Sequence, residues 1–597
     1  MKRKWRGQAA ALCILVVSAL LAWGCASLPA RPDFTRTDST DITRYLSTYI
    51  EKSMKTNDIV GLSIALVDVQ ELLWARGFGY ADKENNVPAT KNTVYRVGSI
   101  SKLFTATAVM KLAQEGKVDI DAPLVTYVPE FSMRTRYPNS SAITPRHIMT
   151  HHSGLPTDYL NGMFARSPER LEGLVSRLHD EYTAFPPGYV FCYSNIAVSI
   201  LGLLVETASK REFSSYMHEE LLHPLGMSRS SFTRSGDASG LLARSYAEGD
   251  VQEQFLLRDM PAGSLYSSVA DMSRFISMVF AEGSSAGTQI LQPETLEEML
   301  RVQTTDTPLD ADTKIGLNWL IQEKEGMGTI VGHSGGVVSF HSHLYAVPGE
   351  KIAVIVMTNC VEGAHASGEI CMEALESLHE LKSGEKIPEK QEPDPEANIP
   401  EQRLKEFEGT YDTIVGSLSL KKKGGRLVTS IRGDSFILFP RQDGTFGMKY
   451  LLLGFLPWSR APLDSMSISF EDASGHRIIV NREGNTRTRI GSRIERVEIP
   501  GAWQQRLGRY SVINLGDNGL YVKSVTLRME DGFLLADVVV SDHEDAPLTV
   551  ALDPIDHEQA VVMGLGRNRG DTYTIRDSGT GEVLHAYGFD FRYTGRE

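Results

Sequence analysis

A segment rich in proline and acidic residues divides this chain into two parts with different patterns. Residues 383–400 (SGEKIPEKQEPDPEANIP) contain four prolines and five acidic residues but only two β-branched residues. Such a composition cannot build a buried core and is typical of a linker. Helix and strand patterns are mixed before this segment, whereas short strands broken by glycine turns dominate after it. The chain of 597 residues is therefore expected to hold at least two domains of different class.

The part before the linker shows a strand pair, then helices, then more strands. Residues 60–69 form a short apolar run that predicts a strand, and the following residues predict its hairpin partner. Apolar or amphipathic helices are predicted at 99–116, 195–209 and 269–283, and several strands within 316–359. This order predicts an α/β or α+β domain over 41–382, in which helices cover an antiparallel sheet.

The part after the linker contains a weak internal repeat. The sequences FEGTYDT, which contains Gly409, and LGRYSVI, which contains Gly508, each place Gly-x-Tyr before a turn and an alternating strand. This repeat predicts two related β-barrel-like units, at 401–500 and 501–597. One larger barrel is the alternative.

The first residues have the pattern of an export signal. A basic start (MKRKWRGQ) precedes an apolar run that is too short for a comfortable transmembrane helix. Cys25 follows directly, which favours a lipoprotein signal over residues 1–25 and a lipid-bearing tether over 26–40. Ordinary cleavage nearby and an uncleaved anchor are the alternatives. We therefore expect an exported protein of the periplasm or cell envelope, with Cys25 as its membrane tether.

Charge and cysteine content exclude some functions. The net charge is -14, and no basic cluster follows the first seven residues, which argues against nucleic acid as a partner. Outside the export segment only Cys192, Cys360 and Cys371 remain. They are too few for a disulfide framework and are expected to be buried as small apolar residues. His333, His341 and His343 lack an acidic or cysteine partner, so neither a metal nor another cofactor is predicted.

Ser99 and Lys102 stand three residues apart at the start of a very apolar helix. Residues at this spacing share a helix face, and a serine hydroxyl needs a nearby base to become a nucleophile. Burial lowers the pKa of a lysine, so that it can be neutral and act as this base. Alone, however, Ser-x-x-Lys occurs by chance in many exposed helices.

Two further motifs strengthen the prediction. Tyr193-Ser194-Asn195 precedes an apolar helix, and His333-Ser334-Gly335-Gly336 begins a strand where glycines would let a substrate backbone approach. Taken singly, Tyr193 is typical of a half-buried core tyrosine and His333 of a loop histidine. Their order along the chain is what favours an active site.

These motifs resemble those of the serine β-lactamase and penicillin-binding-protein superfamily. The closest resemblance is to the branch of class C β-lactamases, DD-peptidases, D-aminopeptidases and esterases, which carries Ser-x-Ser-Lys, Tyr-x-Asn and Lys- or His-x-Gly in this order. The resemblance covers about residues 45–380. It implies an α/β sandwich with Tyr-x-Asn on a helical insertion. The β-rich tail resembles the lipocalin-like domains of some D-aminopeptidase relatives.

The resemblance implies a role for each matching residue of the first two motifs. Ser99 would attack a carbonyl group and become acylated. Lys102 and Tyr193 would act as a coupled base, and Asn195 would hold Lys102 and the substrate amide.

The third motif departs from the β-lactamase pattern, because His333 stands where those enzymes commonly have lysine. Within the branch, histidine here is more common in peptidases and esterases. A histidine also gives a weaker positive field at neutral pH, so it would hold a penicillin carboxylate less firmly.

The resemblance also implies an oxyanion hole. The backbone N–H groups of Ser99 and Gly336, with Gly335 beside them, would form it.

The leading interpretation is an exported serine acyl-hydrolase that acts on D-amino-acid peptides or esters. A class C-like β-lactamase is one alternative, and a sensor that captures cell-wall fragments without turnover is another. The expected partner is thus a small peptide, ester or β-lactam, while the oligomeric state stays open. We expect specificity from the loops at 157–185 and 228–260, with a barrel loop as a further candidate. The chemistry itself is expected to be separable from the tail.

Overall fold

A computed structural model describes residues 28–596 apart from several short gaps, which are 36–37, 235–239, 305–306, 389–391, 453–455, 459–462, 464, 485, 542–546 and 580. Cys25 and the export segment lie outside the described residues, so their roles stay predictions. None of the helices in the described part of the chain is long and apolar enough to cross a membrane.

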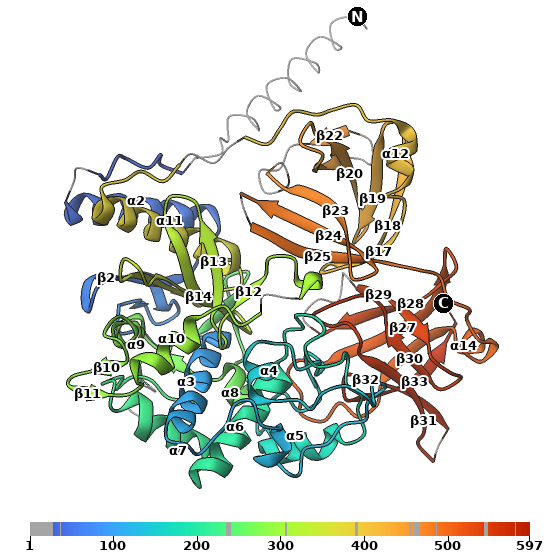
Figure 1. Ribbon diagram of the computed structural model, residues 1–597, viewed down its shortest axis with the longest axis horizontal. Coiled ribbons are helices and arrows are strands. Elements are labelled where there is room, and N and C mark those ends of the chain that lie inside the picture. The colour runs from blue at the N-terminus through green and yellow to red at the C-terminus, as the bar shows by residue number, and fades with distance from the viewer. Residues whose placement is uncertain are drawn as a thin grey trace, which may run out of the picture.

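The first domain is built on one eight-stranded antiparallel sheet (Figure 1). Its order is β12-β13-β14-β15-β16-β1-β2-β3, so strands from both ends of the domain meet at its centre. The bounds are β1 Gly61–Asp68, β2 Glu71–Asp82, β3 Val87–Pro88, β12 Lys314–Ile315, β13 Leu320–Lys324, β14 Gly328–Val337, β15 Phe340–Val347 and β16 Ile352–Thr358.

Helices cover both faces of this sheet. Along β1, Leu62, Ile64 and Leu66 enter one apolar core, whereas Ala65 and Val67 enter another, as the alternation of a strand requires. The first core lies under α2 (Ser39–Thr56) and α11 (Gly363–Ser383). The second lies under α3 (Ser101–Gln114) and α9 (Val269–Phe280), and it continues into the helical insertion.

The helical insertion carries the Tyr193 motif at the start of its longest helix, α6 (Asn195–Ser209). Ser194 caps this helix, because its side chain accepts a hydrogen bond from the backbone N–H of Ala197. The other helices here are short, namely α4 Pro145–Met149, α5 Leu171–Leu178, α7 Phe213–Met217 and α8 Met260–Gly263, with α10 Pro293–Leu300 leading back to the sheet.

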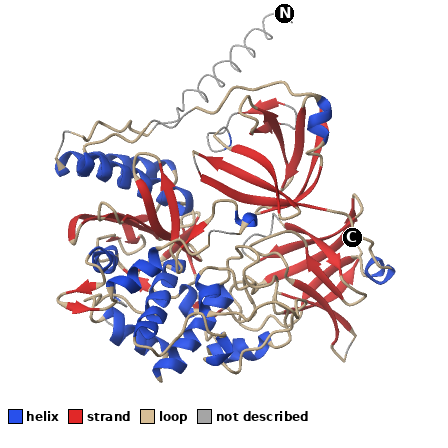
Figure 2. Cartoon of the chain, viewed as in Figure 1, coloured by secondary structure: helices blue, strands red, loops and turns tan. Residues whose placement is uncertain are grey.

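Two closed eight-stranded barrels follow the linker, which confirms the predicted fold class and excludes a single larger barrel (Figure 2). The first is closed by the pairing of β20 with β21, and β22 extends it. Its elements are α12 Glu401–Lys405, β17 Gly409–Thr413, β18 Gly416–Lys423, β19 Arg426–Ile431, β20 Asp434–Pro440, β21 Phe446–Leu452, β22 Leu456–Trp458, β23 Ser467–Ala473, β24 His476–Glu483 and β25 Thr486–Ile494. Those of the second are α14 Gly501–Gln505, β26 Gly508–Val512, β27 Val522–Glu530, β28 Phe533–Val540, β29 Leu548–Pro554, β30 Gln559–Val562, β31 Thr572–Asp577, β32 Glu582–Ala586 and β33 Phe589–Gly595.

The sequence repeat corresponds to the same local structure at the start of each barrel. Tyr411 donates a hydrogen bond to the carbonyl of Phe407 over 3.0 Å, and Tyr510 donates to the carbonyl of Arg506 over 2.7 Å. Each tyrosine thus bonds to the backbone just after the short helix that precedes its first strand, so the repeated Gly-x-Tyr makes the same contact in both barrels.

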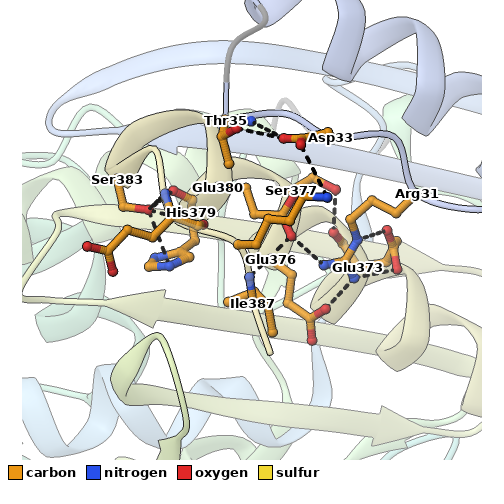
Figure 3. A network of polar contacts seen from close by, with 12 residues as sticks. Arg31, Asp33, Thr35, Glu373, Glu376, Ser377, His379, Glu380, Ser383 and Ile387 are labelled. Atoms are coloured by element: carbon orange, nitrogen blue, oxygen red, sulfur yellow. Dashed lines mark hydrogen bonds and ion pairs between the residues drawn. The ribbon is translucent and has the colours of Figure 1, made fainter. Parts of the chain in front are cut away.

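The segment predicted as a tether lies against α11 in its described part (Figure 3). The Arg31 guanidinium donates two hydrogen bonds to Glu373, at 2.6 and 2.8 Å, and also contacts Glu376 and Glu380. Phe34 is buried beside this network. Residues 28–34 are therefore docked on the first domain.

The second barrel packs against the helical insertion, beside α4 and α5 in Figure 1. Arg136 donates hydrogen bonds to Thr572 and Gln559, at 3.0 and 2.9 Å. Asn161 donates to the carbonyl of Gly588 over 2.8 Å. The tail is thus attached to the domain that carries the motifs.

Candidate active site

Ser99 is the accessible hydroxyl at the start of the apolar helix. It lies in a 3-10 turn (Gly98–Ile100) that leads directly into α3, and it is partly exposed. Ser101, by contrast, is fully buried; it donates a hydrogen bond to the carbonyl of Gly98 over 2.6 Å and accepts one from the N–H of Leu265 over 2.9 Å. Of these two serines, only Ser99 can reach a substrate.

Lys102 is fully buried, and its amine has three close oxygen neighbours. The Nζ atom lies 3.1 Å from Ser99 Oγ, 2.7 Å from Asn195 Oδ1 and 2.7 Å from the carbonyl oxygen of Ala262. Burial, followed by the positive charge of Arg567, lowers the pKa of Lys102 to about 7. A neutral amine can donate to Asn195 and Ala262 and still direct its lone pair at Ser99, which is the geometry of a general base.

Tyr193 lies beside this pair but has a different proton affinity. Its ring centroid is 4.8 Å from Lys102 Nζ, and its hydroxyl hydrogen-bonds with Ser99. Burial raises the pKa of Tyr193 to about 12, although the bond with Ser99 acts in the opposite direction. Lys102 therefore loses its proton at a much lower pH than Tyr193 does, and near neutral pH the tyrosine keeps a proton that it can donate.

Asn195 connects Lys102 to a carboxylate that the sequence analysis missed. The Asn195 amide accepts from Lys102 and donates to Asp158 Oδ1 over 2.7 Å. The negative charges of Asp158 and Asp259 raise the pKa of Lys102 and so oppose the effect of burial. Asp158 follows the HHSGLPT stretch within a predicted specificity loop, but no local pattern marked it.

His333 lies on β14 and is buried, with 3% of its surface exposed. Its Nδ1 donates to the carbonyl of Ser334, and its Nε2 has no hydrogen-bond partner among the described residues. The ring centroid is 6.1 Å from that of Tyr193. Burial, and then the charge of Lys102, lowers the pKa of His333 to about 3, so this residue contributes no positive charge at neutral pH.

The glycines after His333 fit the protein's own backbone. A Cβ atom on Gly335 would lie 1.9 Å from the carbonyl oxygen of Val97, and one on Gly98 would lie 2.7 Å from the nitrogen of Gly336. The close approach expected for a substrate at Gly335 is therefore made by the turn that carries Ser99. Gly336 is exposed beside this turn, where its N–H is available to an oxyanion.

His151 is a second residue beside the site that the sequence analysis did not assign to it. Its ring centroid lies 4.3 Å from that of Tyr193, and its Nδ1 accepts a hydrogen bond from the N–H of Ser194 over 3.3 Å. Burial lowers the pKa of His151 well below its usual value. A neutral His151 thus supports the ring and backbone of the tyrosine motif.

Arg567 reaches the site from the second barrel. It lies in the loop between β30 and β31, and its guanidinium carbon is 5.0 Å from the centroid of the Tyr193 ring. A contact between residues so far apart in the sequence leaves no local signal. A barrel loop therefore lies beside Tyr193, where the sequence analysis expected a contribution to specificity. That the first domain reacts without the tail stays a prediction.

The structure also bears on the predictions for the cysteines and for a metal. Cys192, Cys360 and Cys371 are free and buried, as predicted. Within the described ranges, no group of three or more His, Cys, Asp or Glu side chains is arranged to hold a metal ion.

Comparison with known proteins gives one family match and several relatives. Residues 46–370 match the family model described as Beta-lactamase. Protein flp of Staphylococcus aureus (strain NCTC 8325 / PS 47) is 26% identical over 330 residues, which cover 53% of this chain and 63% of that protein. Beta-lactamase-like protein 2 of Dictyostelium discoideum is 28% identical over 304 residues, or 48% of this chain and 54% of that protein. The chain thus spans less than two thirds of the length of these relatives.

Solved structures share the fold over a longer part of the chain. An octameric penicillin-binding protein homologue from Pyrococcus abyssi has a TM-score of 0.52 and 25% identity, with 75% of this chain and 99% of that chain covered. SurE has a TM-score of 0.55 and 20% identity, with 76% and 99% covered.

Proposed function

Because the chain belongs to the Beta-lactamase family, as its motifs predicted, we propose that it is a serine acyl-hydrolase acting through Ser99. Members of this family are generally serine hydrolases. The observation that carries the proposal is the placement of a buried lysine, with a pKa of about 7, 3.1 Å from an accessible serine.

The geometry supports a definite sequence of proton transfers. Ser99 Oγ attacks the substrate carbonyl and passes its proton to Lys102 Nζ. The carbonyl oxygen becomes an oxyanion, which the N–H groups of Ser99 and Gly336 stabilise. When the tetrahedral intermediate collapses, Tyr193 gives its proton to the leaving group and recovers one from Lys102. Water then attacks the Ser99 ester by the same route in reverse and releases the acid.

The identity of the third-motif residue favours a peptidase or esterase over a β-lactamase, because histidine at this position is more common in the peptidases and esterases that the motifs resemble. His333 is buried and neutral, so the third motif itself supplies no charge to a substrate carboxylate. A sensor without turnover is disfavoured because Ser99, Lys102 and Tyr193 are all present and in contact. We therefore propose activity on D-amino-acid peptides or esters. We also propose that residues 1–25 direct export and that Cys25 anchors the protein to a membrane.

Covalent labelling tests the proposed function. A fluorescent fluorophosphonate should label the wild-type protein and Ser101→Ala, whereas Ser99→Ala should remain unlabelled with an unchanged unfolding temperature. Ser101→Ala is the matched control because Ser101 lies two residues after Ser99, at the start of α3, but is buried. Labelling of Ser99→Ala, or no labelling of folded wild-type protein, would refute the proposal.

A further inference from the structure

The loop between β30 and β31 presents an exposed arginine to the reacting groups. The Arg567 guanidinium carbon lies 5.0 Å from the Tyr193 ring centroid, and the side chain is exposed. Among the described residues, no carboxylate lies within ion-pair distance of Arg567. The loop thus places a permanent positive charge, without a counter-charge, next to the tyrosine that would protonate the leaving group.

The loop is fixed to the first domain on both sides of Arg567. The Cys192 thiol donates to the carbonyl of Gly566 over 3.3 Å, and the N–H of Asn568 donates to Thr157 Oγ1 over 2.9 Å. Cys192 directly precedes the catalytic tyrosine in the chain. The residues flanking Arg567 are therefore held by the same segments that build the active site.

The first barrel holds the loop from the other side. Arg489 donates to the carbonyl of Leu565 over 2.5 Å and also contacts the carbonyl of Phe191. Arg569 forms a buried ion pair with Asp412. A loop anchored at this many points holds the backbone at Arg567 in place before any ligand binds, which lowers the entropy cost of recognition.

The other basic groups of the site are poorly suited to bind an anion. Lys102 is buried and its three hydrogen-bond positions are filled by protein atoms. His333 is buried and neutral. Arg567 is exposed, and its planar guanidinium matches the two oxygens of a carboxylate.

We propose that Arg567 binds a carboxylate on the leaving group of the substrate, so that the enzyme prefers peptides with a free C-terminal carboxylate. The leaving-group side is indicated because Arg567 lies over Tyr193, the proposed proton donor to that group. This inference rests on the proposed function. Arg567 of the second barrel would then supply the positive charge that the neutral His333 of the third motif does not.

Two thioesters with the same acyl group test the inference. N-benzoylglycyl mercaptoacetate and N-benzoylglycyl mercaptoacetamide differ only in the charge of the leaving group, and both give the same acyl-enzyme. The released thiol reports turnover. In the wild-type protein kcat/KM should be higher for the mercaptoacetate substrate. Arg567→Gln should lower the mercaptoacetate-to-mercaptoacetamide ratio on the order of ten- to a hundredfold, as expected for a lost charge-assisted contact. Arg567→Lys should retain part of the preference.

The controls separate this inference from the proposed function. Arg496→Ala removes an exposed arginine beside the turn at Gly532 and should leave the ratio unchanged. An equal loss with both thioesters in Arg567→Gln, or no preference in the wild-type protein, would overturn the inference while Ser99 labelling persists. Absence of both Ser99 labelling and thioester turnover would instead refute the proposed function.

Discussion

At the scale of single residues, the chemistry depends on the proton affinity of Lys102. Its amine is buried among Ser99, Asn195 and Ala262, and burial is the main reason why its pKa falls to about 7. The positive charge of Arg567 lowers this pKa as well, whereas Asp158 and Asp259 raise it. The second barrel therefore acts on the base as well as on the proposed ligand.

This arrangement predicts the pH dependence of acylation. Lys102 must be deprotonated to accept the Ser99 proton, so kcat/KM for the neutral mercaptoacetamide thioester should rise with pH through an apparent pKa near 7. Arg567→Gln removes a positive charge near Lys102, so the rise of kcat/KM should occur at higher pH. A pH series on both proteins measures the shift. If the apparent pKa of this rise is unchanged or lower in Arg567→Gln, Arg567 does not act on Lys102.

At the scale of elements, the active site depends on the contact between β14 and the Ser99 turn. Gly335 packs against the Val97 carbonyl, which also accepts a hydrogen bond from Ser342 over 2.8 Å. This contact places the N–H of Gly336 beside Ser99, the proposed nucleophile. The third motif is therefore as much a packing motif as a binding motif.

Gly335→Ala should displace the strand from the turn, because the new Cβ would lie 1.9 Å from a backbone oxygen. A shift of about 1 Å at reacting groups can cost on the order of a hundredfold in rate, so fluorophosphonate labelling of Ser99 should slow by about that factor. Gly349→Ala is the control, because its Cβ would meet no atom within 4 Å. Equal labelling rates in the two variants would contradict this role for Gly335.

The sequence predicted those elements that carry a motif or a strong local pattern. Helix α6 begins at Asn195, as predicted, because its apolar run and Ser194 cap are local features. Helices α2 and α11 were not predicted; they flank the domain and are stabilised by a shared core that only the folded sheet creates. The glycines of the third motif were assigned to substrate contact because the sequence does not show which backbone approaches them.

At the scale of the whole molecule, the proposed active site is assembled from distant parts of the chain. Gly566 contacts Cys192 across 374 residues of sequence, and the ion pair between Arg569 and Asp412 joins the two barrels at the same loop. Periodicity and motifs predicted two barrels, but they carry no information about how a barrel docks. The role of Arg567 therefore emerges only from the assembled structure.

The proposed role of the second barrel, which is to bring a positive charge into the candidate active site, can be tested by replacing that charge chemically in the full protein. Arg567→Cys introduces an exposed thiol, while the described native cysteines are buried. Modification with 2-aminoethyl methanethiosulfonate should restore preference for the mercaptoacetate thioester, and the negatively charged 2-sulfonatoethyl reagent should lower it further. Turnover of the mercaptoacetamide thioester should change much less. Equal effects of the two reagents on the mercaptoacetate-to-mercaptoacetamide ratio would contradict the claim.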